Sequence, residues 1–166
     1  MPLKVCNIHT VVGNISDTTD LVVSILDRKK DAPNIPLEVP CIQVIFQDTE
    51  HPNDLEYMEM YHGVKQILDF IKSRPDITLS SDIIVHCHAG VSRSSAMAWL
   101  ILIALGMDYK NAFTMLYKQH PNIWPNTTIL SLGSGFLKLP PDFDAFVTQI
   151  NTEISKSRSG YLGYGG

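Results

Sequence analysis

Residues 83–105 contain the feature that most constrains the fold of this 166-residue chain. Ile83 to Val85 are apolar and β-branched and predict a buried strand, whereas Ala96 to Leu105 is an unbroken apolar run that predicts a buried helix. The run is far shorter than the roughly 20 residues that span a bilayer. A loop containing Gly90 separates the two segments. A strand that passes through a short loop into a buried helix predicts an α/β fold.

The rest of the chain also alternates between strand and helix patterns. Residues 3–12 and 41–46 are rich in apolar and β-branched side chains and predict two more strands. From Tyr57 to Ile71, apolar residues recur at spacings of three and four and predict an amphipathic helix. Further helices are expected over residues 21–26 (capped by Asp17, Thr18 or Thr19), after Asp108, after Asn126, and over 143–154. We therefore expect a central, mainly parallel sheet of about four or five strands, flanked by helices on both faces.

Size and composition indicate one globular domain. The hydrophobic content of 45% is sufficient for a single core, which we place in residues 1–156. The last segment, residues 157–166, is rich in glycine and serine and is expected to be a flexible tail. No basic segment followed by a long apolar run occurs near Met1, so no signal peptide is expected.

Charge and cysteine content exclude several classes of partner and cofactor. The net charge of −4 gives no electrostatic reason to expect nucleic acid or a membrane as a partner. The three cysteines, Cys6, Cys41 and Cys87, are odd in number and form no CxxC pair. A disulfide scaffold and a metal site are therefore not expected, and a reducing, cytoplasmic location fits better.

The loop after Val85 carries residues suited to phosphate chemistry. Cys87, at a strand end facing a helix start, lies near unpaired N–H groups and the positive end of the helix dipole, which favours the thiolate. The planar fork of Arg93 matches two phosphoryl oxygens, and Ser94 can donate a hydrogen bond to the sulfur. The loop amides form an anion cradle, so the expected substrate-binding residues are His88, Ala89, Gly90, Val91, Ser92 and Arg93.

The stretch HCHAGVSRSS, residues 86–95, resembles the HCx5RS signature of the cysteine-based protein tyrosine phosphatases, and most closely their dual-specificity branch. The resemblance continues downstream, covers roughly Val39 to Leu132, and includes Ala112, Met115, Leu116, Pro121, Pro125 and Asn126. It implies a dual-specificity phosphatase-like fold and a reaction through a cysteinyl-phosphate, with Cys87 as nucleophile and no metal or other cofactor.

A general acid is also required, because a phosphate ester leaves poorly as an oxyanion. The resemblance places an aspartate on the loop after the strand that precedes the nucleophile. Here that strand is Cys41 to Phe46, and the first carboxylate after it is Asp48. Glu50 and Asp54 are the competing candidates, although Asp54 can also be the N-cap of the following helix. We expect Asp48 to be the catalytic acid.

Other residues have expected supporting roles. His86 is expected to orient the loop through hydrogen bonds, Ser94 to assist the sulfur, and Asn126 to support the loop from the proline-containing turn. His88 is expected either to contact the substrate or to face solvent. Trp124 either lines the mouth of the site or packs against the turn.

Two roles are possible for Cys41. In some relatives an oxidised nucleophile is protected by a disulfide with a second cysteine, and Cys41 is a candidate partner for Cys87. The alternative is a small apolar residue on a strand.

The five residues between Cys87 and Arg93 contain no lysine, the side chain that relatives acting on inositol phosphates tend to carry there. We therefore expect a phosphoprotein substrate, with phosphotyrosine first and phosphoserine or phosphothreonine as further options. The alternatives are a phosphatase of phosphoinositides, inositol phosphates or other small phosphoesters, and a non-catalytic phosphopeptide-binding module. A rhodanese-like sulfurtransferase and an arsenate reductase-like enzyme are weaker rivals, because Arg93-Ser94 and the cysteine pattern argue against them.

Overall fold

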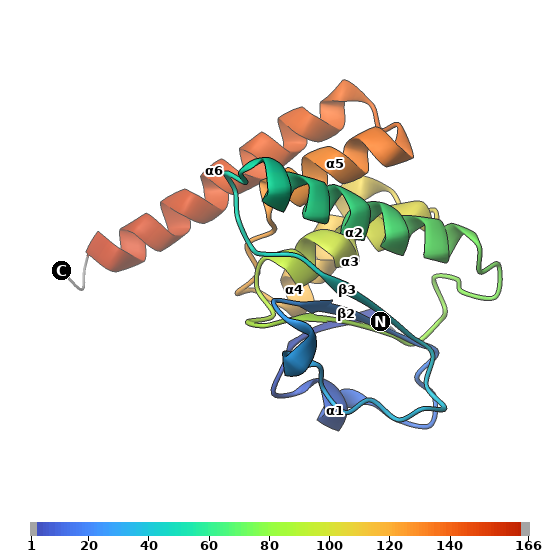
Figure 1. The fold of residues 1–166 in the computed structure, drawn as a ribbon. Coiled ribbons are helices and arrows are strands. Elements are labelled where there is room, and N and C mark those ends of the chain that lie inside the picture. Colours follow the sequence, from blue (N-terminus) through green and yellow to red (C-terminus); the bar gives the residue numbers. More distant parts are fainter. Residues whose placement is uncertain (1–2, 164–166) are drawn as a thin grey trace.

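The computed structural model of the chain describes residues 3–163 and has a four-stranded parallel sheet at its centre (Figure 1). The spatial order is β1-β4-β2-β3, and every neighbouring pair of strands is parallel. The strands are β1 (Leu3–Asn7), β2 (Leu21–Leu26), β3 (Cys41–Ile45) and β4 (Ile83–Cys87). This arrangement confirms the predicted α/β class and the predicted parallel sheet.

Helices cover the two faces of the sheet very unequally (Figure 1). Five of them form one layer with the main hydrophobic core: α2 (Asp54–Lys72), α3 (Arg93–Ala104), α4 (Tyr109–Gln119), α5 (Thr127–Leu137) and α6 (Pro141–Gly163). On the opposite face, α1 (Val11–Asn14) and neighbouring loops pack against Val22 and Ile84, and a short 3-10 helix, η1 (Lys29–Asp31), follows β2. The second helical layer is therefore reduced to a single turn and loops.

The prediction of a helix over residues 21–26 is wrong, because this segment is strand β2. All six of its residues are buried, since β2 lies between β4 and β3 with both faces covered. A strand buried on both faces carries a continuous apolar run and no alternation, so its spacing can match that of a helix. The β-branched residues in LVVSIL were the local signal for a strand.

The register of the strands places their carboxyl ends at one edge of the sheet. Cys87 of β4 lies opposite Asn7 of β1, and Leu26 of β2 lies opposite Ile45 of β3. In open parallel sheets, ligands bind outside this edge. The loops that follow the four strands are therefore the place to look for a functional site.

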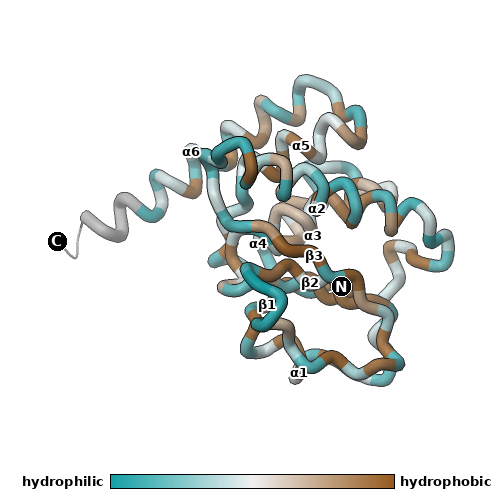
Figure 2. The backbone as a smooth tube through the Cα atoms, in the orientation of Figure 1, coloured by the Kyte–Doolittle hydropathy of each residue, from teal (hydrophilic) through white to brown (hydrophobic). Residues whose placement is uncertain are grey.

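Helix α3 anchors the loop between β4 and itself to the core. Ten of its twelve residues, from Arg93 to Leu102, are buried. Trp99 donates a hydrogen bond from Nε1 to the Tyr109 carbonyl (2.9 Å), and its ring contacts the ring of Phe113. The tube in Figure 2 shows the apolar segments of the strands at the centre of the molecule. A helix fixed on all sides holds its first residue, Arg93, at a defined position.

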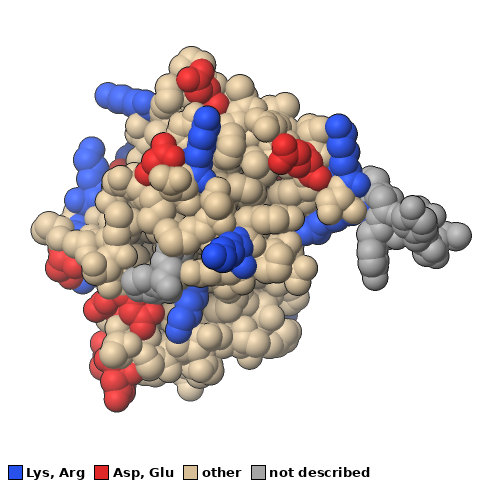
Figure 3. Space-filling model, turned by 180° about the vertical axis from the view of Figure 1, so that it is seen from behind, with Lys and Arg blue, Asp and Glu red and all other residues tan. Residues whose placement is uncertain are grey.

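Helix α6 continues to Gly163, and residues 164–166 lie outside the described part of the chain. The domain end at residue 156 and the flexible tail over residues 157–166 stay predictions. Within residues 3–163, no helix is long and apolar enough to cross a membrane. On the face shown in Figure 3, basic side chains are spread singly, with acidic side chains between them.

Candidate active site

Cys87 ends β4 and is almost completely buried, with 2% of its surface exposed. The Gly90 backbone N–H donates a hydrogen bond to Cys87 Sγ over 3.3 Å, and a second hydrogen bond joins Sγ to Ser94 Oγ over 3.1 Å. When the sulfur is a thiolate, the Ser94 hydroxyl is the donor of that second bond. Two hydrogen bonds and the start of α3 thus stabilise a negative charge on this sulfur.

The loop of residues 88–92 is held by backbone hydrogen bonds to segments far away in the sequence. The His88 carbonyl accepts a hydrogen bond from Ile8 N (3.1 Å). The Val91 carbonyl accepts one from Trp124 N (3.0 Å), and the Ser92 carbonyl accepts one from Asn126 N (3.2 Å). Gly90 has a φ of +73°, and a Cβ at this position would lie 2.7 Å from the carbonyl carbon of Cys6. Both the backbone conformation and the contact with β1 require glycine here.

Arg93 is buried (3% exposed) and is fixed at one nitrogen. Nη1 donates to the Phe46 carbonyl over 2.7 Å and lies 2.8 Å from Asp27 Oδ1. Nε is buried and has no hydrogen-bond partner among the described residues. A buried, unpaired guanidinium N–H is costly unless a ligand satisfies it. The geometry therefore leaves one edge of the guanidinium free for an anion.

Asp27 was not predicted from the sequence as a site residue. It directly follows β2, at the carboxyl edge of the sheet, and its backbone carbonyl accepts a hydrogen bond from Gln47 Nε2 (2.9 Å). The misassignment of residues 21–26 as a helix removed the signal that would have found it, because a polar residue after a parallel strand is a candidate site residue.

The structure places Asp48 beside the loop. Its Oδ1 accepts hydrogen bonds from Ser92 Oγ (2.8 Å) and from Asn126 Nδ2 (3.0 Å), and the side chain is exposed at the surface. Asn126 is fully buried; it also donates to the Thr49 carbonyl (3.0 Å) and accepts from Ile129 N (2.9 Å). Asn126 thus connects the segment that carries Asp48 to the start of α5.

The two competing carboxylates lie elsewhere. Both carboxylate oxygens of Glu50 accept from Thr127 N at 3.1 Å, so this side chain caps the start of α5. Asp54 is the first residue of α2 and is exposed. The expectation that Asp54 caps α2 is wrong: Asn53 is the N-cap and forms a capping box with Glu56.

His86 is fully buried beneath the loop. Its Nε2 lies 2.6 Å from Ser24 Oγ on β2, and its Nδ1 lies 3.4 Å from the Cys87 carbonyl. Burial lowers the pKa of His86 below its ordinary value of 6.5, and the charge of Arg93 acts in the same direction. A neutral imidazole held by hydrogen bonds to β2 and β4 can orient the loop, and this role of His86 stays a prediction.

A cavity of about 510 Å³ borders Ala89, Gly90 and Val91 and also has Lys4 in its lining. Two more cavities flank the loop. One, of about 650 Å³, is lined by Ile8, His9, Asp27, Arg28, Asp31, Pro33, Gln47 and His88. The other, of about 520 Å³, is lined by Glu50, His51, Val91, Ser92, Trp124, Thr127 and Asn151. His88 is exposed and its ring centroid lies 6.0 Å from that of His9, so it borders the first cavity. Trp124 borders the second and donates from Nε1 to Asn151 Oδ1 over 2.5 Å.

The fold does not bring Cys41 to the nucleophile. Cys41 on β3 and Ile84 on β4 both lie opposite Val22 of the intervening β2, so Cys41 is three residues out of register with Cys87. Two strand spacings alone amount to roughly 9–10 Å, and a disulfide requires Cα atoms about 4.4–6.8 Å apart. The protective disulfide is incompatible with this arrangement, and both thiols are free. Within residues 3–163, no cluster of three potential metal ligands occurs.

No protein-family model matches the sequence, and no curated protein matches it. Solved structures do match. Human DUSP28 superposes with a TM-score of 0.62 at 16% identity, covering 90% of this chain and 96% of that one. A human tyrosine phosphatase-like serine/threonine/tyrosine-interacting protein gives 0.60 at 17% identity, covering 81% and 90%. The PTP-2 phosphatase of Cydia pomonella gives 0.57 at 21% identity, covering 81% and 85%. At these identities the likeness establishes the fold, which is the dual-specificity phosphatase-like fold expected from residues 86–95.

Proposed function

We propose that this chain, which has the dual-specificity phosphatase fold, is a cysteine-dependent phosphatase of phosphoproteins. Its preferred substrate residue is phosphotyrosine. The observation that carries the proposal is the convergence on one loop of a hydrogen-bonded buried thiol, Cys87, and a buried arginine, Arg93, with an unpaired Nε. A carboxylic acid, Asp48, borders the same loop. These groups supply the nucleophile, the anion-binding fork and the proton donor that phosphoryl transfer requires.

In the first step, the Cys87 thiolate attacks phosphorus and forms an S–P bond as the P–O bond to the leaving group breaks. The protonated carboxyl of Asp48 gives its proton to the departing oxygen. The free edge of the Arg93 guanidinium and the loop amides bind the equatorial phosphoryl oxygens. These donors are fixed before the reaction begins, so they stabilise the transition state without reorganisation.

In the second step, water attacks the cysteinyl-phosphate and Asp48, now a carboxylate, accepts a proton from that water. The S–P bond breaks, and phosphate and the Cys87 thiolate are released. The hydrogen bond between Sγ and Ser94 Oγ stabilises the sulfur as a leaving group. Asp48 returns to its protonated form, so the cycle is closed.

The surroundings of the loop support a phosphoprotein over a polyphosphate. The residues that line the three cavities beside the loop include two Lys or Arg side chains. These are Arg28, whose Nε lies 3.0 Å from Asp31 Oδ2, and Lys4. A substrate with several phosphates would need further unpaired cations. Phosphoserine and phosphothreonine remain within the proposed range, and inositol phosphates are the competing substrate class.

The test is hydrolysis of 4-nitrophenyl phosphate by the purified protein in the presence of a chelator. We expect turnover that is unchanged by the chelator. The Cys87→Ser variant should have no turnover, and the matched control Cys41→Ser should retain it. Absence of turnover in the unmodified protein, with phosphopeptide binding intact, would identify a binding module. In a panel of phosphotyrosine, phosphoserine and phosphothreonine peptides and inositol phosphates, phosphotyrosine peptides should be the best substrates. Preference for the inositol phosphates would refute the proposed substrate class.

A further inference from the structure

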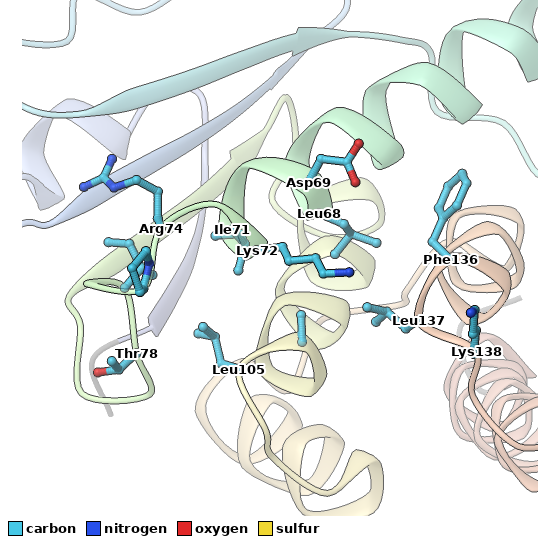
Figure 4. A pocket seen from close by; sticks show the side chains of 13 residues that line it. Leu68, Asp69, Ile71, Lys72, Arg74, Thr78, Leu105, Phe136, Leu137 and Lys138 are labelled. Atoms are coloured by element: carbon cyan, nitrogen blue, oxygen red, sulfur yellow. The ribbon is translucent and has the colours of Figure 1, made fainter.

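A further cavity lies at the end of the molecule opposite the catalytic loop. Helices α2, α3 and α5 meet there with their C-terminal ends and enclose a hollow of about 580 Å³ (Figure 4). Small-molecule sites in proteins have volumes of roughly 300–1,000 Å³. The lining residues are Leu68, Asp69, Ile71, Lys72, Arg74, Pro75, Ile77, Thr78, Ala104, Leu105, Phe136, Leu137 and Lys138. The function of the catalytic loop makes no use of this cavity.

The walls of the cavity are in part apolar, with polar surface of nearly equal extent. Leu68, Ile71 and Ile77 belong to the buried core, and Leu105 and Phe136 are partly buried beside them. Figure 4 shows Leu68, Ile71, Leu105 and Phe136 around the hollow. Such walls favour a ligand with an apolar body, because its transfer from water buries apolar surface on both partners.

The charged residues of the lining leave an excess of positive charge. Asp69 is paired with Lys65 (2.6 Å), and Arg74 is paired with Asp76 (2.6 Å). Lys72 and Lys138, by contrast, have no carboxylate within salt-bridge distance among the described residues. In Figure 4 the Lys72 side chain extends toward the side of the cavity where Lys138 lies.

Lys138 also occupies an unusual backbone position. It is the C-cap of α5 with φ 54° and ψ 48°, and within residues 3–163 it is the one non-glycine residue with positive φ. This left-handed conformation costs an ordinary residue roughly 1–2 kcal/mol, and glycine is the usual residue at such helix ends. A lysine here places a cation at the rim of the cavity where glycine would be the more stable choice.

We infer that this cavity binds a small amphiphilic monoanion, with its apolar body between α2, α3 and α5 and its carboxylate between Lys72 and Lys138. The inference rests on charge complementarity and on the size of the hollow, and it holds whether or not the catalytic loop is active. A hollow of this volume between three helix ends fits a compact ligand.

The test is a titration of the ¹⁵N-labelled protein with octanoate, followed through backbone amide shifts, with octan-1-ol and butanoate as matched probes. Octanoate should shift the amides of residues 68–78, 104–106 and 136–138 with saturation. Octan-1-ol lacks the charge and butanoate lacks the apolar body, so both should bind more weakly. Saturating shifts located elsewhere, or octan-1-ol binding as tightly as octanoate, would overturn the inference.

Variants of the two lysines complete the test. Exposed ion pairs contribute little individually, so Lys138→Gly should weaken octanoate binding about threefold and the double variant Lys72→Gln/Lys138→Gly about tenfold. Lys118→Gln, on the distant surface of α4, is the control and should bind as the unmodified protein does. Lys138→Gly relieves the left-handed strain, so its melting temperature should not fall and weaker binding cannot be attributed to unfolding. Unchanged affinity in the double variant would refute the site.

Discussion

Two loops at the same edge of the sheet are built in opposite ways. The loop that we propose binds phosphate, residues 87–93 (the phosphate-binding loop), contains the proposed nucleophile, a glycine and an arginine within seven consecutive residues. The acid loop, residues 47–53, carries two carboxylates, and a third follows directly at Asp54. Contacts with Asn126 and Thr127, nearly 80 residues further along the chain, distinguish these carboxylates.

Local sequence is sufficient to place functional groups together only where they lie close along the chain. In the phosphate-binding loop, chain connectivity alone forces the functional groups together, because a strand end, a tight turn and a helix start follow one another. In the acid loop, the role of each carboxylate depends on its neighbours in space. Asp48 meets the phosphate-binding loop at Ser92, whereas Glu50 caps α5. The predictions below test this contrast.

Of the three variants that test this contrast, Asp48→Asn should have the largest effect. Loss of a general acid costs about 10²–10⁴-fold in rate, and the loss should be full for an alkyl phosphate and much smaller for 4-nitrophenyl phosphate, whose leaving group needs little protonation. The measurement is kcat/KM for both substrates. Glu50→Gln is the matched control, since its amide oxygen can still accept from Thr127 N. An equal loss for both substrates in Asp48→Asn, or a leaving-group-dependent loss in Glu50→Gln, would assign the acid to another residue.

A second prediction concerns the geometry of the phosphate-binding loop. In Gly90→Ala the new methyl group would lie 2.7 Å from the Cys6 carbonyl carbon, so the loop must move away from β1. A displacement of about 1 Å can cost 10²-fold in rate, and overpacking should lower the free energy of unfolding by about 1–3 kcal/mol. Urea denaturation and 4-nitrophenyl phosphate turnover measure the two effects. The control is Gly135→Ala on α5, where no atom lies within 4 Å and the variant should be at least as stable as the unmodified protein. A fully active Gly90→Ala protein would contradict the described loop.

The smallest effect is expected at Asp27, which holds Arg93 through Nη1. Hydrogen bonds to charged groups contribute about 1.5–3 kcal/mol, so Asp27→Ala should lower kcat/KM at least about tenfold. Asp27→Asn retains an acceptor oxygen and should recover most of that loss if Asp27 acts by positioning the guanidinium. Equal losses in both variants would show that the charge of Asp27, and not its position, matters. Asp31→Asn, beside the first flanking cavity, is the control.

Several elements of the fold were predictable from local patterns. The strand at residues 41–45, the amphipathic α2 and the cap of α4 by Asp108 follow from apolar spacing and capping chemistry. The segment 21–26 was not predictable in the same way. Its burial on both faces depends on the helical layer over one face and on α1 with neighbouring loops over the other. Burial on both faces removes the alternation that identifies a strand. Asp27 was missed as a direct consequence.

The nearness of Cys87, Gly90 and Arg93 follows from the sequence, because they are joined by a chain too short to place them far apart. The sequence also determined the α/β class through the apolar strand and helix on either side. The tertiary structure alone decided which carboxylate borders the loop, which residue holds Arg93, and that Cys41 lies away from Cys87. These are contacts between segments distant in the chain, and the packing of the sheet and helices fixes them once the whole core has formed.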